Sequence, residues 1–132
     1  MTDVLVHTNT FAAPVGRVYA AITNDAEHSA FTGAPATGMG HVGASFTTHG
    51  GAIEGTTLAA KENSYLVQAW RPADWPEGVY SLVRYDFGDD RNSTTLTLTH
   101  SSMPDGASEH LAAGWNERYW APLAIYLGDH SA

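Results

Sequence analysis

The strongest constraint on the fold of this chain is a long amphipathic helix predicted at its end, after segments rich in strand patterns. Over residues 108–127, apolar and aromatic side chains recur every three or four positions, at Leu111, Trp115, Tyr119, Leu123 and Tyr126. This spacing puts them on one helix face, which needs a partner to cover it. Pro122 lies inside the pattern, and we expect it to kink the helix or to end its regular part near Trp120.

The earlier segments alternate as strands do. Strand patterns cover residues 4–11, a short stretch near 44–46, and residues 52–60, 65–71, 79–87 and 94–100. After the first of these, Pro14 opens one short helix, and Thr23-Asn24-Asp25 caps a second that ends near Phe31. A sheet with one apolar face must be covered, and the last helix is the only element long enough. The sequence therefore predicts an α+β fold, a curved antiparallel sheet wrapped around the C-terminal helix, with any cavity between them.

Composition excludes several classes of protein. The 132 residues favour one domain, 1–132. Fourteen Asp and Glu against six Lys and Arg give a net charge of −8, which disfavours nucleic acid and anionic membrane surfaces as partners. With no cysteine, the chain has no disulfide, thiol nucleophile or thiolate metal site. No apolar run is long enough for membrane insertion and no signal peptide opens the chain, so we expect a cytoplasmic protein.

Two motif-like features do not support a cofactor or a metal. Gly38-Met39-Gly40-His41-Val42-Gly43 matches the spacing of a dinucleotide-binding loop, but a strand-like segment follows instead of the helix that would hold the pyrophosphate. We therefore read these glycines as turns. The seven histidines form no i, i+4 pair and no metalloprotease motif. We expect no cofactor and no bound metal.

His100 and Glu54 are the candidates for acid–base chemistry. His100 is in phase with Leu96 and Leu98, so it should face the helix, and a hydrogen-bonded core histidine is favoured over a ligand contact. Glu54 could be an inward carboxylate, but an outward, solvated one is favoured. Arg84 and Asp86 share a strand face and are expected to neutralise each other. The sequence does not decide whether the chain is an enzyme, and no catalytic residue is assigned.

Large aromatic side chains are numerous for so small a domain. Buried Trp and Tyr need partners for their polar atoms, and rings with a few polar groups are the usual lining of a small-molecule pocket. We expect the cavity to be lined by Phe31, Trp70, Trp75, Tyr80, Leu98, His100, Trp115, Tyr119 and Leu123. Such a cavity would bind a small hydrophobic or aromatic molecule, oriented by His100 and the tyrosine hydroxyls.

Several segments together resemble a known family. They are Phe31-Thr32-Gly33-Ala34-Pro35-Ala36, Gly50-Gly51-Ala52-Ile53-Glu54-Gly55, Ala69-Trp70-Arg71-Pro72-Ala73-Asp74-Trp75-Pro76-Glu77-Gly78, residues 94–99, Gly114-Trp115 and Tyr119-Trp120. They look like the Aha-type (AHSA) domain, the C-terminal domain of the activator of the heat-shock chaperone ATPase, in the START-like (SRPBCC) superfamily. The resemblance runs from about Phe11 to Leu127. It implies the helix-grip (START/Bet v-like) fold, with Trp70, Trp75 and Trp115 as core or cavity wall.

The resemblance leaves three functions to weigh. The superfamily holds lipid carriers, hormone receptors and polyketide cyclases, and it implies no catalytic residue for this chain. Ligand binding is the first function, and a cyclase- or hydrolase-like enzyme that uses His100 or Glu54, the two residues considered above, is the second. A chaperone-associated interaction module is the third. Val79 stands where the co-chaperone type has a histidine, and we expect the chain to lack the separate N-terminal domain and the Asn- and Trp-rich leader, which argues against chaperone binding. A homodimer, through the sheet edge or the last helix, stays open.

Overall fold

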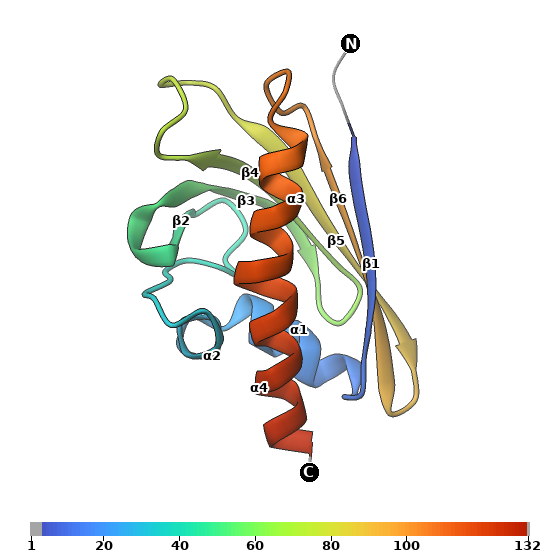
Figure 1. Ribbon diagram of the computed structural model, residues 1–132. Helices are drawn as coiled ribbons and strands as arrows, with labels where there is room; N and C mark the ends of the chain where they lie inside the picture. Colours follow the sequence, from blue (N-terminus) through green and yellow to red (C-terminus); the bar gives the residue numbers. More distant parts are fainter. Residues whose placement is uncertain (1–3, 132) are drawn as a thin grey trace.

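The computed structural model describes residues 4–131, and side chains through residue 128 (Figure 1). The elements follow the order β1 (Leu5–Phe11), α1 (Val15–Thr23), α2 (Asp25–Thr32), β2 (Ser45–Thr48), the 3-10 turn η1 (His49–Gly51), β3 (Ile53–Lys61), β4 (Tyr65–Pro72), β5 (Ser81–Asp90), β6 (Ser93–Ser101), α3 (Ser108–Trp115), the π-helical segment η2 (Asn116–Trp120) and α4 (Ala121–Ser131). The sequence-based boundaries agree with these within a few residues. The predicted first strand, the two short helices and the meander are confirmed.

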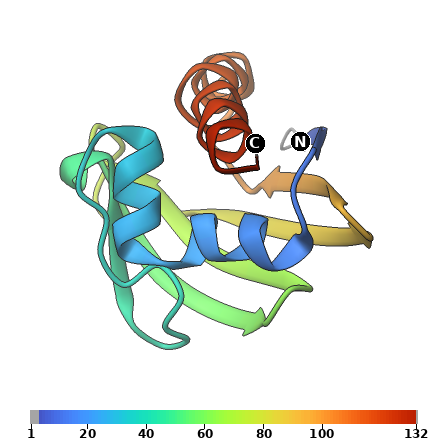
Figure 2. The same ribbon diagram turned by 90° about the horizontal axis from the view of Figure 1, so that it is seen from below.

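The strands form one antiparallel sheet that curves around the last helix. Its order is β1-β6-β5-β4-β3-β2, so β1 and β2 are the edges. Figures 1 and 2 show α3, η2 and α4 running as one rod on the inner side of the sheet, with α1 and α2 closing the end where α4 lies. This is the helix-grip α+β fold that the resemblance implied.

Strand alternation determines which side chains face the helix. Along β6, Thr94, Leu96, Leu98 and His100 are buried, and the residues between them are half-buried. The side chains of a strand point alternately to its two faces, so the buried set lies on the inner face. Gly55 is an inner position of β3 that lies very close to the β4 backbone. A Cβ atom on Gly55 would be 1.8 Å from the carbonyl oxygen of Ala69.

The loops before the sheet are held by polar side chains. Asn24 caps α2 by accepting from the Glu27 amide at 3.0 Å, as the sequence predicts. The Asp25 carboxylate accepts from the amides of Gly38 and Met39 at 3.0 and 2.9 Å. Residues 38–43 form turns and β2 follows them, so this glycine pattern has no helix N-terminus to hold a pyrophosphate.

The last helix is irregular just before Pro122, where the sequence predicts a kink or the end of its regular part. The regular α-helix α3 gives way to the π-helical η2 and then continues as α4. The Ala121 amide donates to the Asn116 carbonyl, five residues back, just before the proline that has no N–H to donate. The wide turn buries the consecutive residues Tyr119 and Trp120 together. Within residues 4–131, the helices are too short or too polar to traverse a bilayer.

Candidate functional site

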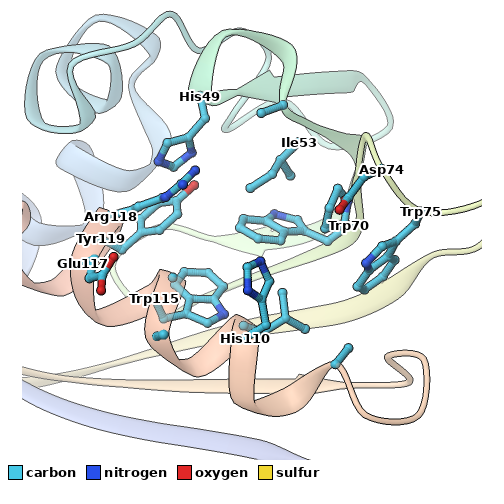
Figure 3. A pocket seen from close by; sticks show the side chains of 16 residues that line it. His49, Ile53, Trp70, Asp74, Trp75, His110, Trp115, Glu117, Arg118 and Tyr119 are labelled. Carbon is cyan, nitrogen blue, oxygen red and sulfur yellow. The ribbon is translucent and has the colours of Figure 1, made fainter.

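A groove of about 710 Å³ opens between the first half of the last helix and the β3–β4 side of the sheet (Figure 3). Its lining comes from η1, the start of β3, the end of β4 and the loop after it, the loop before α3, α3 itself and η2. The lining residues are His49, Ala52, Ile53, Trp70, Pro72, Asp74, Trp75, Ala107, His110, Leu111, Ala113, Gly114, Trp115, Glu117, Arg118 and Tyr119. We call this space the groove.

Aromatic rings form the floor of the groove. The Trp70 and Trp115 indoles are stacked, with centroids 4.8 Å apart and planes 15° from parallel. The Tyr119 ring adjoins Trp115 at 4.6 Å. Trp75 is only half-buried and lies in the loop that follows β4. Trp115 is also stacked on Trp120, with centroids 5.2 Å apart, so these rings form a packed apolar wall of the groove.

Hydrogen bonds fix both stacked indoles. Trp70 Nε1 donates to Gln68 Oε1 at 3.2 Å, and the Gln68 amide donates in turn to the Met39 carbonyl at 3.1 Å. Trp115 Nε1 donates to His100 Nδ1 at 3.1 Å. Because each polar atom has a buried partner, the rings are held in one orientation without a ligand.

His100 is a buried core histidine with both ring nitrogens engaged. Nδ1 accepts from Trp115, so Nε2 carries the proton and donates to Ser81 Oγ at 2.7 Å, and Ser81 donates to the Trp70 carbonyl at 3.0 Å. Burial lowers the pKa of His100 to about 4, so the ring is neutral at pH 7. Neither nitrogen is free to reach a molecule in the groove, which leaves the acid–base role weighed for His100 without a geometric basis.

A second buried histidine lies behind Tyr119. His28 Nδ1 donates to the Ile22 carbonyl at 2.9 Å, so its Nε2 is an acceptor for the Tyr119 hydroxyl, 3.3 Å away. The same hydroxyl lies 3.4 Å from Thr48 Oγ1. Burial lowers the pKa of His28 to about 4 and raises that of Tyr119 above its ordinary value. Both groups are therefore neutral, and they anchor the helix to α2 and β2.

Polar groups lie at the ends of the groove. His49 and Arg118 share one end beside Tyr119, whereas Asp74 lies at the other end beside Trp75 (Figure 3). Burial lowers the pKa of His49, and the Arg118 guanidinium lowers it further, while the Arg118 backbone opposes both. Nε2 of His49 is buried without a hydrogen-bond partner among the described residues. Glu117 lines the groove at the same end as Arg118, so that end holds a guanidinium and a carboxylate, and the other end holds the Asp74 carboxylate.

Glu54 lies on the outer face of the sheet, as the sequence favoured. Its carboxylate accepts from Arg71 Nη1 at 3.3 Å and from the Tyr80 hydroxyl at 3.0 Å. Arg71 also donates to the carbonyls of Trp75 and Pro76, at 2.6 and 3.0 Å. Glu54 therefore supports the Trp75 loop from outside and does not line the groove. Arg84 and Asp86 pair on the same outer face at 2.9 Å, as expected.

The structure brings together some of the side chains predicted to line a cavity. Trp70, Trp75, Trp115 and Tyr119 line the groove. Phe31, Leu98, His100 and Leu123 are buried in the core and do not reach it, and Tyr80 is exposed on the outer face. Leu123 and Leu127 of α4 are buried in the core with Leu96 and Leu98 of the sheet, and the groove lies beside the first half of the last helix.

Sequence reasoning missed the polar residues of the groove. His49 lies in a glycine-flanked turn with no periodicity, and Arg118 lies in the π-helical segment, where regular helix spacing does not apply. Gly114 lines the groove because it has no side chain to fill it. No group of three or more His, Asp or Glu side chains that could hold a metal is found within the described part of the chain.

Residues 12–128 match the family model described as Activator of Hsp90 ATPase homolog 1-like protein. A Schizosaccharomyces pombe protein, C1711.08, is 29% identical over 119 residues, and the human Activator of 90 kDa heat shock protein ATPase homolog 1 is 28% identical over 119 residues. Each alignment covers 90% of this chain but 35% of the relative, so the chain spans about a third of their length.

A solved structure resembles nearly the whole chain. PFC0360w, described as an HSP90 activator from Plasmodium falciparum, has a TM-score of 0.89 and 25% sequence identity. The match covers 95% of this chain and 96% of that one. The arrangement of sheet and terminal helix is therefore shared with a protein of similar extent.

Proposed function

The chain belongs to the family of Activator of Hsp90 ATPase homolog 1-like proteins, and from that premise we propose that it binds a small apolar or aromatic molecule in the groove. One observation carries the proposal: a groove of about 710 Å³ has stacked indoles as its floor. Ligand pockets are commonly about 300–1,000 Å³ and are lined by apolar and aromatic side chains. A ring system in the groove would pack against the outer side of this stacked pair.

The groove is already shaped for such a ligand. Gln68 and His100 hold the two indoles, and Arg71 holds the Trp75 loop through the carbonyls of Trp75 and Pro76. Rings that are already ordered lose little conformational entropy when a ligand arrives, so more of the burial free energy appears as affinity. The described residues thus provide a preorganised surface.

Fluorescence titration with the neutral probe N-phenyl-1-naphthylamine tests the proposal. We expect saturable binding with one site per chain and a change in tryptophan emission. In Gly114→Leu, a side chain would enter the groove at a position where a Cβ meets nothing within 4 Å, so the variant should fold and lose binding. Gly128→Leu is the matched control, because Gly128 is equally open but lies in α4, outside the groove.

Two results would overturn the proposal. One is binding of the probe to the wild-type chain that does not saturate. The other is Gly114→Leu binding the probe as tightly as Gly128→Leu does, because the binding would then lie elsewhere on the molecule. Melting temperatures of both variants close to the wild-type value would show that the fold is intact.

We propose contact with a chaperone as the second candidate function. The likeness to PFC0360w, described as an HSP90 activator, covers nearly the full length of both chains and favours this candidate. Measuring the ATPase rate of purified 90 kDa heat shock protein with and without this chain tests it. Stimulation that survives in Gly114→Leu would show that chaperone contact does not use the groove. An ATPase rate that is unchanged at a saturating concentration of this chain would contradict the second candidate function.

A further inference from the structure

Charged side chains line both ends of the groove, and Glu117 lies with Arg118 at one of them. Figure 3 places the His49 and Arg118 side chains together beside Tyr119, and Asp74 beside Trp75 across the indole floor. The chain has fourteen acidic residues and six basic ones, yet one of those basic residues lines the groove. A ligand lying along the floor would meet donors at one end and a carboxylate at the other.

Arg118 has no acidic partner among the described side chains. Arg17, Arg71 and Arg84 each form an ion pair, whereas no pair includes Arg118, although Glu117 precedes it. A guanidinium offers five N–H donors in a planar fork that matches carboxylate, sulfonate and phosphate oxygens. Arg118 is therefore available for an external anion.

His49 is held at the same end with its Nε2 unused. Its backbone has a φ of 54°, in the left-handed region, so the turn that presents the ring carries a conformational cost. The ring packs against Tyr119 with centroids 5.0 Å apart, and Nε2 is buried without a partner. A buried polar atom without a hydrogen-bond partner destabilises the fold, and an anionic group beside the ring would supply that partner.

We propose that the ligand of this groove is an amphipathic anion: its aromatic or apolar body lies on Trp70 and Trp115, and its acid group is bound between Arg118 and His49. The inference rests on the proposed function and adds the chemical class and the orientation of the ligand. Arg118 offsets the Glu117 charge at its own end, whereas no arginine or lysine in the groove lining offsets Asp74 at the Trp75 end, so an acid group is disfavoured there.

The matched probes 8-anilinonaphthalene-1-sulfonate and N-phenyl-1-naphthylamine test this inference, since they differ only in the sulfonate. We expect wild-type chain to bind the sulfonate probe more tightly. Arg118→Gln and His49→Asn should each lower the affinity for the sulfonate probe by about five- to tenfold. Each should change the affinity for the neutral probe by less than about twofold. Asn is chosen at His49 because it tolerates the left-handed conformation.

Lys61→Gln is the charge-matched control, because Lys61 is exposed at the opposite end of β3 from the groove. Sulfonate affinity in Arg118→Gln equal to that in Lys61→Gln, or a wild-type chain that binds the neutral probe as tightly as the charged one, would overturn the inference and leave the proposed function standing. Failure of both probes to saturate would overturn the proposed function, and this inference with it.

Discussion

The indole N–H of Trp115 donates to Nδ1 of His100 over 3.1 Å, so a residue in the floor of the groove sets the tautomer of a fully buried imidazole. His100→Leu leaves that N–H and the Ser81 hydroxyl without their partner. We expect the free energy of unfolding to fall by about 2–4 kcal/mol, measured by urea denaturation. In a Trp115→Phe background the same change should cost less, because the unpaired donor is already gone. Equal costs in both backgrounds would contradict the coupling.

The pH dependence of stability follows from the two buried histidines. His28 and His100 have pKa values of about 4 when folded, against 6.5 for the exposed side chain. As pH falls from 6.5 towards 4, the unfolded chain takes up protons that the folded chain does not bind, so this contribution to stability is complete above 6.5 and is lost below it. Each residue should contribute roughly 2 kcal/mol of destabilisation between pH 7.5 and pH 5.

Urea denaturation at the two pH values measures this contribution. The fall in the free energy of unfolding on going to pH 5 should be smaller in His28→Gln and in His100→Gln than in the wild-type chain. Comparing each variant with itself at pH 7.5 removes the cost of the substitution. A fall as large as that of the wild-type chain in both variants would show that neither ring is held neutral.

The hydroxyls of Tyr85 and Tyr119 are both buried but differ in their partners. No partner for the Tyr85 hydroxyl is found among the described residues, whereas the Tyr119 hydroxyl contacts His28 and Thr48. Tyr85→Phe removes an unpaired polar atom and should raise the free energy of unfolding by about 1 kcal/mol, while Tyr119→Phe should lower it by about 1–2 kcal/mol. Chemical denaturation of the two variants distinguishes these signs, and a loss in Tyr85→Phe would reveal a partner.

We expect the substitution of glycine by alanine to have opposite effects on stability at Gly55 and at Gly114. A Cβ at Gly55 would lie 1.8 Å from the Ala69 carbonyl oxygen and 2.9 Å from the Phe46 ring, so Gly55→Ala should cost about 3 kcal/mol. A Cβ at Gly114 meets nothing within 4 Å on a helix, so Gly114→Ala should stabilise by about 0.5–1 kcal/mol. Thermal unfolding of both proteins checks the pair. A stable Gly55→Ala would show that β3 and β4 can separate.

The order of elements could be predicted because each has a clear period. Leu96, Leu98 and His100 alternate with threonines, and all three face the helix. The π-helical segment could not be predicted, because Pro122 indicates only that a hydrogen bond is lost, and the surrounding packing decides whether the helix kinks, ends or widens.

The site was predictable only in part. Periodicity shows which face a side chain takes, but it does not show whether neighbours fill the space beside it. Trp70 and Leu98 both face inward, yet only Trp70 borders open volume. Tyr80 precedes inward-facing Ser81 and so lies in the opposite phase, which places it with Glu54 on the outer face. The expectation that Tyr80 lines the cavity was wrong because it ignored this alternation.

The extra residue in the wide turn divides the last helix into two halves, which both pack into the core and of which the first also lines the groove. Upstream, α3 and the segment Asn116–Trp120 supply the groove with Gly114, Trp115 and Arg118; downstream, Leu123 and Leu127 are packed into the core. A regular helix would turn about 100° per residue, so removing one residue here would rotate one half against the other. Substitutions at exposed upstream positions such as Arg118 can therefore change the lining of the groove without altering the buried residues of either half.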